Sequence, residues 1–277
     1  MRSLSNRSLT VVAQFVAAAA LFAQDLPVEE KQTIRKNFTA RRMEIDNVHG
    51  YIHVTGYDGS EIQVTIQETV RAASKERIQD ARRDMKLDIT QESDLVRFCV
   101  DKTRCCGQGR REWGYRVVYD YDIKAPRNTT IYLHAVNEGD IKVDGISGDY
   151  DIENVNGPIE VLEAAGSGRI YSVNGKVRVV SRRNPPAAST FGSLNGAVDL
   201  YFQPDLAADL RMKTFNGKFY TDFDLTALAP RAVTPERRDG KLLYRVDRYT
   251  GARAGRGGPE IRLDGFNGVI RILKREN

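Results

Sequence analysis

Histidine, cysteine and tryptophan are scarce in this chain of 277 residues, which has three histidines, three cysteines and one tryptophan. Of the histidines, His49 and His53 flank a turn and a strand, and His134 lies far along the chain, so a paired metal site is not expected. No Ser–His–Asp order, phosphate-cradling glycine loop or dinucleotide motif is present either. We therefore expect no cofactor and no enzymatic activity.

The chain also lacks a second long apolar run beyond the one near its start. That run, Leu9 to Phe22, follows Arg2 and Arg7 and ends at the small residue Ala23, as in a secretory signal peptide covering residues 1–23. It is too short to predict a transmembrane helix. No cysteine follows the expected cut, so a lipoprotein is not indicated. The sequence predicts an exported protein of the periplasm, the cell surface or the medium.

Charge of one sign is not in large excess. The net charge is +5, and it falls to +3 when residues 1–23 are removed, which is too little to indicate a nucleic-acid partner. The charge is unevenly spread, because the segment Arg231–Arg275 carries +7 and the rest of the mature chain −4. One interpretation is a patch that docks on an anionic envelope surface, such as lipid head groups or acidic polysaccharide, with the candidate residues Arg237, Arg238 and Arg253. The other is that long basic side chains shield the open edge of the last repeat.

The three cysteines lie together at Cys99, Cys105 and Cys106. In an exported protein this spacing favours a disulfide from Cys99 to Cys105 or to Cys106, and reduced thiols are the alternative. A zinc site would need a well-spaced fourth ligand, which the sequence does not offer.

One short phrase recurs through the second half of the chain. It consists of an apolar residue, Asn-Gly, any residue, and then alternating apolar and polar residues. Successive glycines of the phrase are 18, 21, 21 and 51 residues apart. The five copies have their turn pairs at Asn156-Gly157, Asn174-Gly175, Asn195-Gly196, Asn216-Gly217 and Asn267-Gly268. Self-similarity at about 20 residues is typical of a repeat architecture.

Each copy predicts a short strand with one buried face, after a turn in which Asn-Gly tolerates positive φ. The alternative of two-residue hairpins would need paired arms of similar length around each turn. Turns every nine to eleven residues, between Gly139 and Gly168, instead suit two strands per coil. The predicted fold is all-β, a right-handed parallel β-solenoid or β-helix with stacked asparagines. Its predicted core includes Val161, Val177, Val179, Val198, Leu200, Ile270 and Ile272.

The predicted organisation has three parts. After residues 1–23, a β-rich part covers residues 24–130, and its single short helix runs from a cap at Ser74 to about Met85. The Asn-Gly repeats then cover residues 131–277, interrupted by an insertion at about 222–260.

Several of these segments resemble a bacterial putative-adhesin family, a β-solenoid domain of unknown function. The resemblance lies in Glu44–Gly50, Tyr57–Gly59, Tyr121–Pro126, the Asn-Gly repeats and Gly258–Gly268, and it covers nearly the whole mature chain. It implies the fold and brings no catalytic residues.

The repeats are rich in acids, namely Asp140, Asp144, Asp149, Asp151, Glu153, Glu160 and Glu163. Paired carboxylates could serve a carbohydrate-active β-helix enzyme, a lyase or a hydrolase. Most of these acids occupy outward positions of alternating strands, where a solvated face is the simpler interpretation. Tyr150, Tyr171, Tyr201 and Tyr220 could line a binding face or be half-buried strand residues. The sequence thus favours an exported, non-enzymatic, adhesin-like binding or scaffold module of the cell envelope. Its partner would be an envelope polysaccharide, an anionic lipid surface or another protein.

Overall fold

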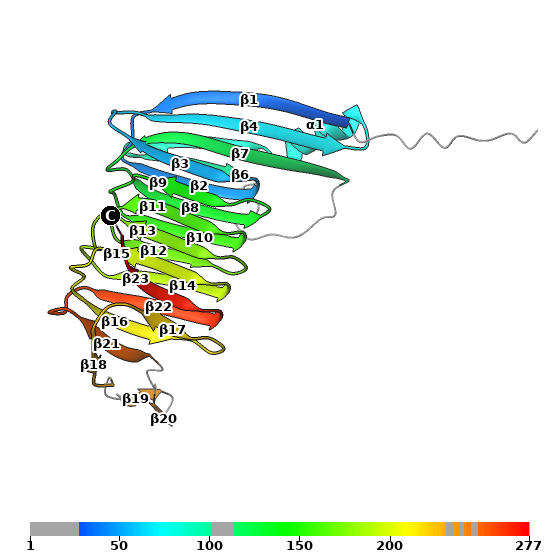
Figure 1. The fold of residues 1–277 in the computed structure, drawn as a ribbon. Helices are drawn as coiled ribbons and strands as arrows, with labels where there is room; N and C mark the ends of the chain where they lie inside the picture. The colour runs from blue at the N-terminus through cyan, green and yellow to red at the C-terminus, as the bar shows by residue number, and fades with distance from the viewer. Residues whose placement is uncertain (1–27, 101–113, 231–234, 239–240, 245–248, 277) are drawn as a thin grey trace, which may run out of the picture.

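The computed structural model describes residues 28–100, 114–230, 235–238, 241–244 and 249–276. Within them the chain is all-β apart from one helix, as predicted. Its strands form two large, mostly parallel sheets of ten and eleven strands, which do not close into a barrel (Figure 1). No described helix is both long and apolar enough to cross a membrane. Residues 1–23 lie outside the described part.

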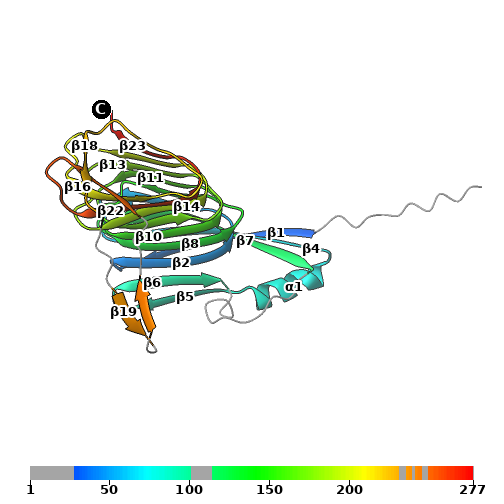
Figure 2. The same ribbon diagram turned by 90° about the horizontal axis from the view of Figure 1, so that it is seen from below.

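The repeat phrase explains the two sheets, because the strand before each Asn-Gly pair joins one sheet and the strand after it joins the other. Two such strands make one coil, and successive coils lie over one another when seen from below (Figure 2). We refer to the ten-stranded sheet as sheet one and to the eleven-stranded sheet as sheet two. In spatial order, the parallel strands of sheet one after β7 (Tyr115–Pro126) are β3 (Ile52–Tyr57), β9 (Ile141–Asp144), β11 (Ile159–Ala164), β13 (Val177–Ser181), β15 (Val198–Phe202), β23 (Ile270–Lys274) and β17 (Phe219–Thr221). Those of sheet two after β6 (Leu95–Val100) are β2 (Arg42–His49), β8 (Thr130–Asn137), β10 (Tyr150–Asn156), β12 (Gly168–Ser172), β14 (Ser189–Asn195), β22 (Glu260–Asn267) and β16 (Ala208–Lys213).

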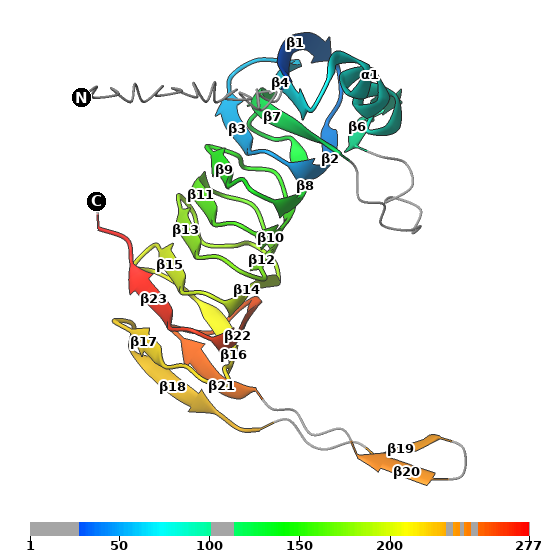
Figure 3. The same ribbon diagram turned by 90° about the vertical axis from the view of Figure 1, so that its right-hand side faces the viewer.

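The order of the coils in space departs from their order in the sequence at two places (Figure 3). The last coil of the chain, β22 and β23, lies between the coil of β14 and β15 and the coil of β16 and β17. The first coil, β2 and β3, lies between β6 and β7 on one side and β8 and β9 on the other. Both large sheets therefore run without interruption across residue 130.

The N-terminal end of the stack is closed by long antiparallel strands. In sheet one, β1 (Val28–Phe38) pairs with β4 (Ile62–Ala72), and β4 pairs with β7 (Tyr115–Pro126). In sheet two, β6 (Leu95–Val100) pairs antiparallel with the edge strand β5 (Leu87–Glu92).

The helix α1 (Lys75–Asp84) packs at this end against β4 and β7. Its N-cap is Ser74, whose side chain accepts a hydrogen bond from the Arg77 amide, and its C-cap is Met85. Ile78 and Ala81 are its buried residues. These features confirm the predicted helix and its cap.

The insertion between β17 and β22 covers the other end. It contains β18 (Leu225–Leu228) and β21 (Thr250–Ala254), which extend sheet two antiparallel to the last parallel strand β16. It also contains a separate two-stranded sheet of β19 (Pro235–Arg238) and β20 (Lys241–Tyr244). In sheet one nothing pairs with the outer edge of the short strand β17 within the described part of the chain.

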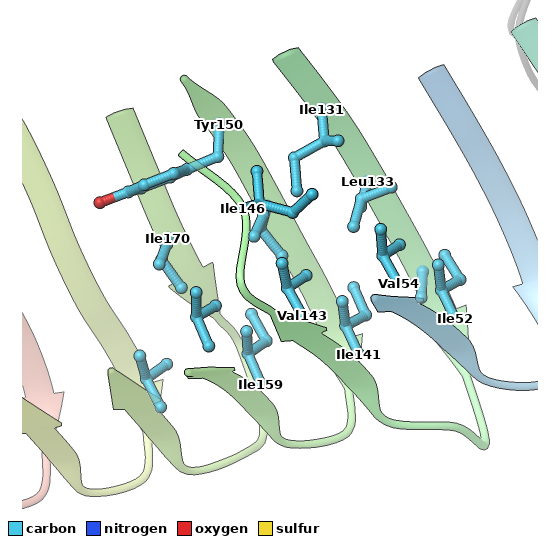
Figure 4. Close-up of a cluster of buried hydrophobic side chains, with 14 of the residues drawn as sticks. Ile52, Val54, Ile131, Leu133, Ile141, Val143, Ile146, Tyr150, Ile159 and Ile170 are labelled. Carbon is cyan, nitrogen blue, oxygen red and sulfur yellow. The ribbon is translucent and has the colours of Figure 1, made fainter. Parts of the chain in front are cut away.

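The core lies between the two sheets and is built from the inward residues of each strand (Figure 4). Aliphatic side chains of successive coils lie side by side along the stack, as do Ile52, Ile141 and Ile159, which are register partners in sheet one (Figure 4). The seven predicted core residues are all at most 2% exposed, which confirms that prediction.

Candidate functional site

The asparagines of the repeat form a single ladder along the corner where the two sheets meet. Five of the six side-chain amides each donate a hydrogen bond to the Oδ1 atom of the asparagine in a neighbouring coil, and the five N···O distances lie between 2.8 and 3.0 Å. In spatial order the ladder contains Asn137, Asn156, Asn174, Asn195, Asn267 and Asn216. The donors all point toward the N-terminal end of the stack, so Asn137 only accepts a ladder bond and Asn216 only donates one.

The glycines of the five Asn-Gly pairs lie beside this ladder, and most of them do not have the positive φ that the sequence predicted. Among the five, only Gly268 has a positive φ, of 150°, so the expectation of positive φ at Asn-Gly is wrong for the others. The reason for glycine is a close approach instead. A Cβ at Gly175 would overlap the carbonyl oxygen of Gly157, and a Cβ at Gly196 would overlap that of Gly175. The column of glycines allows the coils to stack at strand spacing.

Charged side chains on the outer faces pair between neighbouring strands. On sheet one, Glu160 binds Arg178 at 2.7 Å. Nearby, Asp199 binds both Lys176 at 2.7 Å and Arg271 at 2.8 Å. Burial opposes ionisation of Asp199, but the hydrogen bonds from these two cations outweigh it and hold the pKa below its usual value.

The other acids of the repeats are also mostly engaged. Arg169 binds Glu153 at 2.7 Å and Asp151 at 3.4 Å, and Arg275 binds Glu163 at 2.5 Å. Three more acids are placed separately, with Asp140 bound by Lys142 and His53, Asp149 accepting from the Ser167 amide, and Asp144 exposed on β9. Most of these acids therefore form rows along the faces. Asp140 and Glu160 do line one common hollow, where each is bound by a cation.

The histidines are likewise kept apart. The His53 Nε2 atom lies 3.1 Å from Asp140, and the His134 Nδ1 atom lies 3.1 Å from Asp46. Each of these contacts joins the coil of β2 and β3 to the coil of β8 and β9. Among the residues that the structure describes, no group of three or more His, Cys, Asp or Glu side chains could hold a metal ion.

Two open hollows lie on the outer face of sheet one, with volumes of about 430 Å³ and about 300 Å³. Arg178 lines both, and it is held by Glu160. The larger hollow is walled by Val180, Tyr201 and Leu273, with Asp222 at its rim. Asp222 accepts a hydrogen bond from the Lys274 amide. Both hollows are spaces between paired rows of side chains.

The four tyrosines do not share a face. Tyr150 is buried in the core, Tyr171 lies beneath Arg169, Tyr201 lies beneath Arg178 and Tyr220 is 49% exposed. Sequence reasoning missed two other aromatic residues, Phe215 and Phe266, which are 72% and 43% exposed. The available signal was that phenylalanine occupies the position before Asn-Gly where the earlier copies have valine or leucine.

The three arginines of the predicted basic patch belong to different sheets. Arg237 and Arg238 lie on β19, and Arg253 lies on β21 of sheet two. Two hydrogen bonds, of 2.7 and 2.9 Å, tie Arg253 to Asp209, so its charge is already balanced. The shielding alternative also needs correction, because the last repeat of the sequence is not at an open edge.

Of the three cysteines, Cys99 lies buried on β6 and is disulfide-bonded. Cys105 and Cys106 lie outside the described residues, so the identity of its partner stays a prediction.

Comparison with known proteins gives no matching family model and no matching curated protein. The chain does align with the solved structure of a "putative cell adhesion protein" from Clostridium sporogenes, at 10% identity and a TM-score of 0.42, covering 90% of this chain and 100% of that one. A "putative adhesin" from Bacteroides fragilis aligns at 12% identity and a TM-score of 0.34, covering 88% of this chain and 97% of that one. A "putative lipid binding protein" from Parabacteroides distasonis aligns at 12% identity and a TM-score of 0.30, covering 90% of this chain and 97% of that one. The first two names agree with the family that the sequence resembles.

Proposed function

We propose that this protein is an exported, non-enzymatic, right-handed parallel β-solenoid that acts as an adhesin-like binding or scaffold module at the bacterial cell envelope. The observation that carries the proposal is the pairing of the outer-face charges. Rows such as Glu160–Arg178 and Asp199–Arg271 fix the side chains of successive strands to one another. The result is a stiff, repetitive surface suited to display and contact.

Catalysis on carbohydrate would require a different arrangement. A glycosidase needs two carboxyl groups that face the same scissile bond, one of them held protonated. In this protein Asp151 and Glu153 both bind Arg169, at 3.4 and 2.7 Å, so the two neighbouring carboxyl groups share one cation.

The end of the stack that contains the insertion is the proposed contact with the envelope. Residues 208–277 carry a net charge of +6, whereas residues 24–207 carry −3. Two exposed cations at this end, Lys218 and Arg256, form no ion pair within the described part of the chain. A one-sided distribution of this kind draws a protein end-on to an anionic surface. The proposed partner class is therefore an anionic envelope surface.

The test is binding of the mature chain to vesicles that contain an anionic phospholipid, compared with zwitterionic vesicles and with an acidic polysaccharide. Binding should weaken steeply between about 20 mM and 150 mM salt, because exposed charges are screened over that range. The triple charge reversal Arg237→Glu, Arg238→Glu and Arg256→Glu should abolish it, whereas lysine at the same positions should preserve it. Arg253 is left unchanged, since reversing it would repel Asp209 and disturb β21.

Failure to bind any anionic surface at low salt would overturn the proposed docking. Release of reducing ends from a polysaccharide by the purified protein would overturn the non-enzymatic assignment.

A further inference from the structure

We propose that Phe215 and Phe266 form an apolar anchor that enters the interface of an anionic phospholipid bilayer. The pair is called the phenylalanine corner below. The inference rests on the proposed function and specifies it, because it names the side chains that make the contact and selects lipid among anionic surfaces.

The phenylalanine corner lies at the end of the asparagine ladder, on the last two coils of the stack. The two rings are stacked with centroids 4.9 Å apart and an angle of 4° between their planes. Phe266 belongs to the coil of β22 and β23, and Phe215 lies between β16 and β17 in the coil beyond it. With no further parallel coil after it, Phe215 is 72% exposed.

The fold itself does not explain these aromatic residues. At the same place in the repeat, earlier coils have Val155, Val173 and Leu194, which are half-buried and leave less apolar surface in water. Of the four large apolar side chains that are exposed in the described residues, three lie on the last two coils, namely Phe215, Phe266 and Tyr220. A cluster of exposed aromatic residues at one end of a protein marks a contact surface.

Cations flank the phenylalanine corner on both sides of the turn. Lys213 precedes Phe215 on the outer face of sheet two, and Lys218 follows it immediately before β17. Lys213 lies 3.5 Å from Asp264, whereas Lys218 is exposed and unpaired within the described part of the chain. Aromatic rings beside exposed lysines suit the boundary between acyl chains and anionic head groups, where each cation near the surface adds to the binding.

Two other occupants fit the surface less well. A second copy of the chain, meeting end to end, would bring two ends of +6 together. In the described part of the two large sheets, the open strand edges at this end belong to β17 and β18, which have only three and four residues. An acidic polysaccharide would satisfy the lysines, but the two phenylalanine rings stack on each other, so only one face of each ring is left for a sugar. A bilayer uses both the charge and the apolar surface.

The experiment compares the double variant Phe215→Ser and Phe266→Ser with wild type and with Tyr132→Ser. Tyr132 is a matched control, because it is 36% exposed on the outer face of sheet two near the opposite end of the stack. At physiological salt the partition coefficient of the double variant on anionic vesicles should fall roughly ten-fold or more, since two phenylalanine rings lose their burial. The control should bind like wild type, and circular dichroism should show all three folded.

A second readout locates the corner in the bilayer. In a Trp113→Phe background, a tryptophan placed as Phe215→Trp should be quenched by lipids brominated on their acyl chains, and one placed as Tyr132→Trp should not. Equal quenching of the two, or wild-type binding by the double serine variant, would overturn the anchor. If that happens while the charge reversals still abolish binding, the proposed docking stands without it. Binding to acidic polysaccharide alone, with none to vesicles, would also overturn the anchor.

Discussion

The repeated middle of the stack and its N-terminal end are stabilised in different ways. In the middle, from β8 to β15, each coil makes the same asparagine and glycine contacts with the next, and ion pairs such as Glu160–Arg178 join some of the neighbouring strands. At the N-terminal end, long antiparallel strands and α1 are held by contacts that occur once. The middle therefore depends on a spacing that every coil must respect, and the end depends on a few individual side chains.

The unique contacts centre on Glu68, which is only 6% exposed on β4. The Tyr119 hydroxyl donates toward its Oε1 atom at 3.0 Å, and the Arg82 Nε atom donates to its Oε2 atom at 3.2 Å. Burial next to this carboxylate raises the pKa of Tyr119, which stays protonated as a donor. Arg82 also binds Glu30 at 2.9 Å, so one helical arginine ties α1 to both β1 and β4.

The largest effect is expected from overfilling the repeated middle. In Gly175→Val, the new side chain would overlap the carbonyl of Gly157 and force two coils apart. We expect the free energy of unfolding in urea to fall by about 3 kcal/mol or more. The control is Gly114→Ala, where a Cβ would meet nothing within 4 Å and should cost less than about 0.5 kcal/mol. Equal losses of unfolding free energy in the two variants would show that the close stacking of coils is not what requires glycine at position 175.

The next effect breaks the N-terminal end. Arg82→Met leaves the nearly buried Glu68 without its cation, and we expect unfolding to be easier by about 2 kcal/mol, reduced from the full cost of a buried charge because Arg82 is 32% exposed. Adding Glu68→Gln should restore part of the loss, since the buried charge is then removed. The matched control on the same helix is Arg83→Met, whose side chain is 70% exposed and should matter little. No recovery in the double variant would argue against a charge effect.

A smaller effect distinguishes the inside of the asparagine ladder from its end. Asn195 both donates and accepts a ladder bond, whereas Asn216 only donates one. Asn195→Ala should therefore cost about 1 kcal/mol in unfolding free energy, and Asn216→Ala about half of that. A larger cost at Asn216 than at Asn195 would contradict the ladder as a shared source of stability.

The smallest effect concerns the joint between the two regions, where His134 on β8 meets Asp46 on β2. The hydrogen bond to Asp46 raises the pKa of His134, despite opposing burial, with further help from Asp151 and Glu153. The protonated histidine is thus favoured in the folded state, so this stability is fully present below pH 6.5 and is lost as the pH rises through the raised pKa. Because His134 is 46% exposed, less than about 0.5 kcal/mol is expected.

The measurement is urea unfolding at pH 5.5 and pH 8, for wild type and for His134→Gln. Wild type should lose more stability than the variant on going to pH 8. The opposite order would show that His134 is not held in its protonated form by folding.

Sequence alone determined the regular part of this protein, because a period of about 20 residues with two-residue alternation allows few folds other than stacked parallel strands. The core residues such as Val179 and Leu200 and the helix capped by Ser74 followed from the same local patterns. The sequence also predicted positive φ at the Asn-Gly turns, and that prediction is wrong for four of the five glycines.

Tertiary structure decided what depends on contacts between distant segments. Placing β22 and β23 inside the stack joins residues such as Asn195 and Asn267, which are 72 positions apart, and no local pattern encodes that order. The same arrangement places Phe215 on the outermost parallel coil. Arg253 forms an ion pair with Asp209, so its charge is not free to act in the predicted basic patch. Exposure and charge balance are properties of neighbours in space, so the candidate contact surface could be found only once the coils were in place.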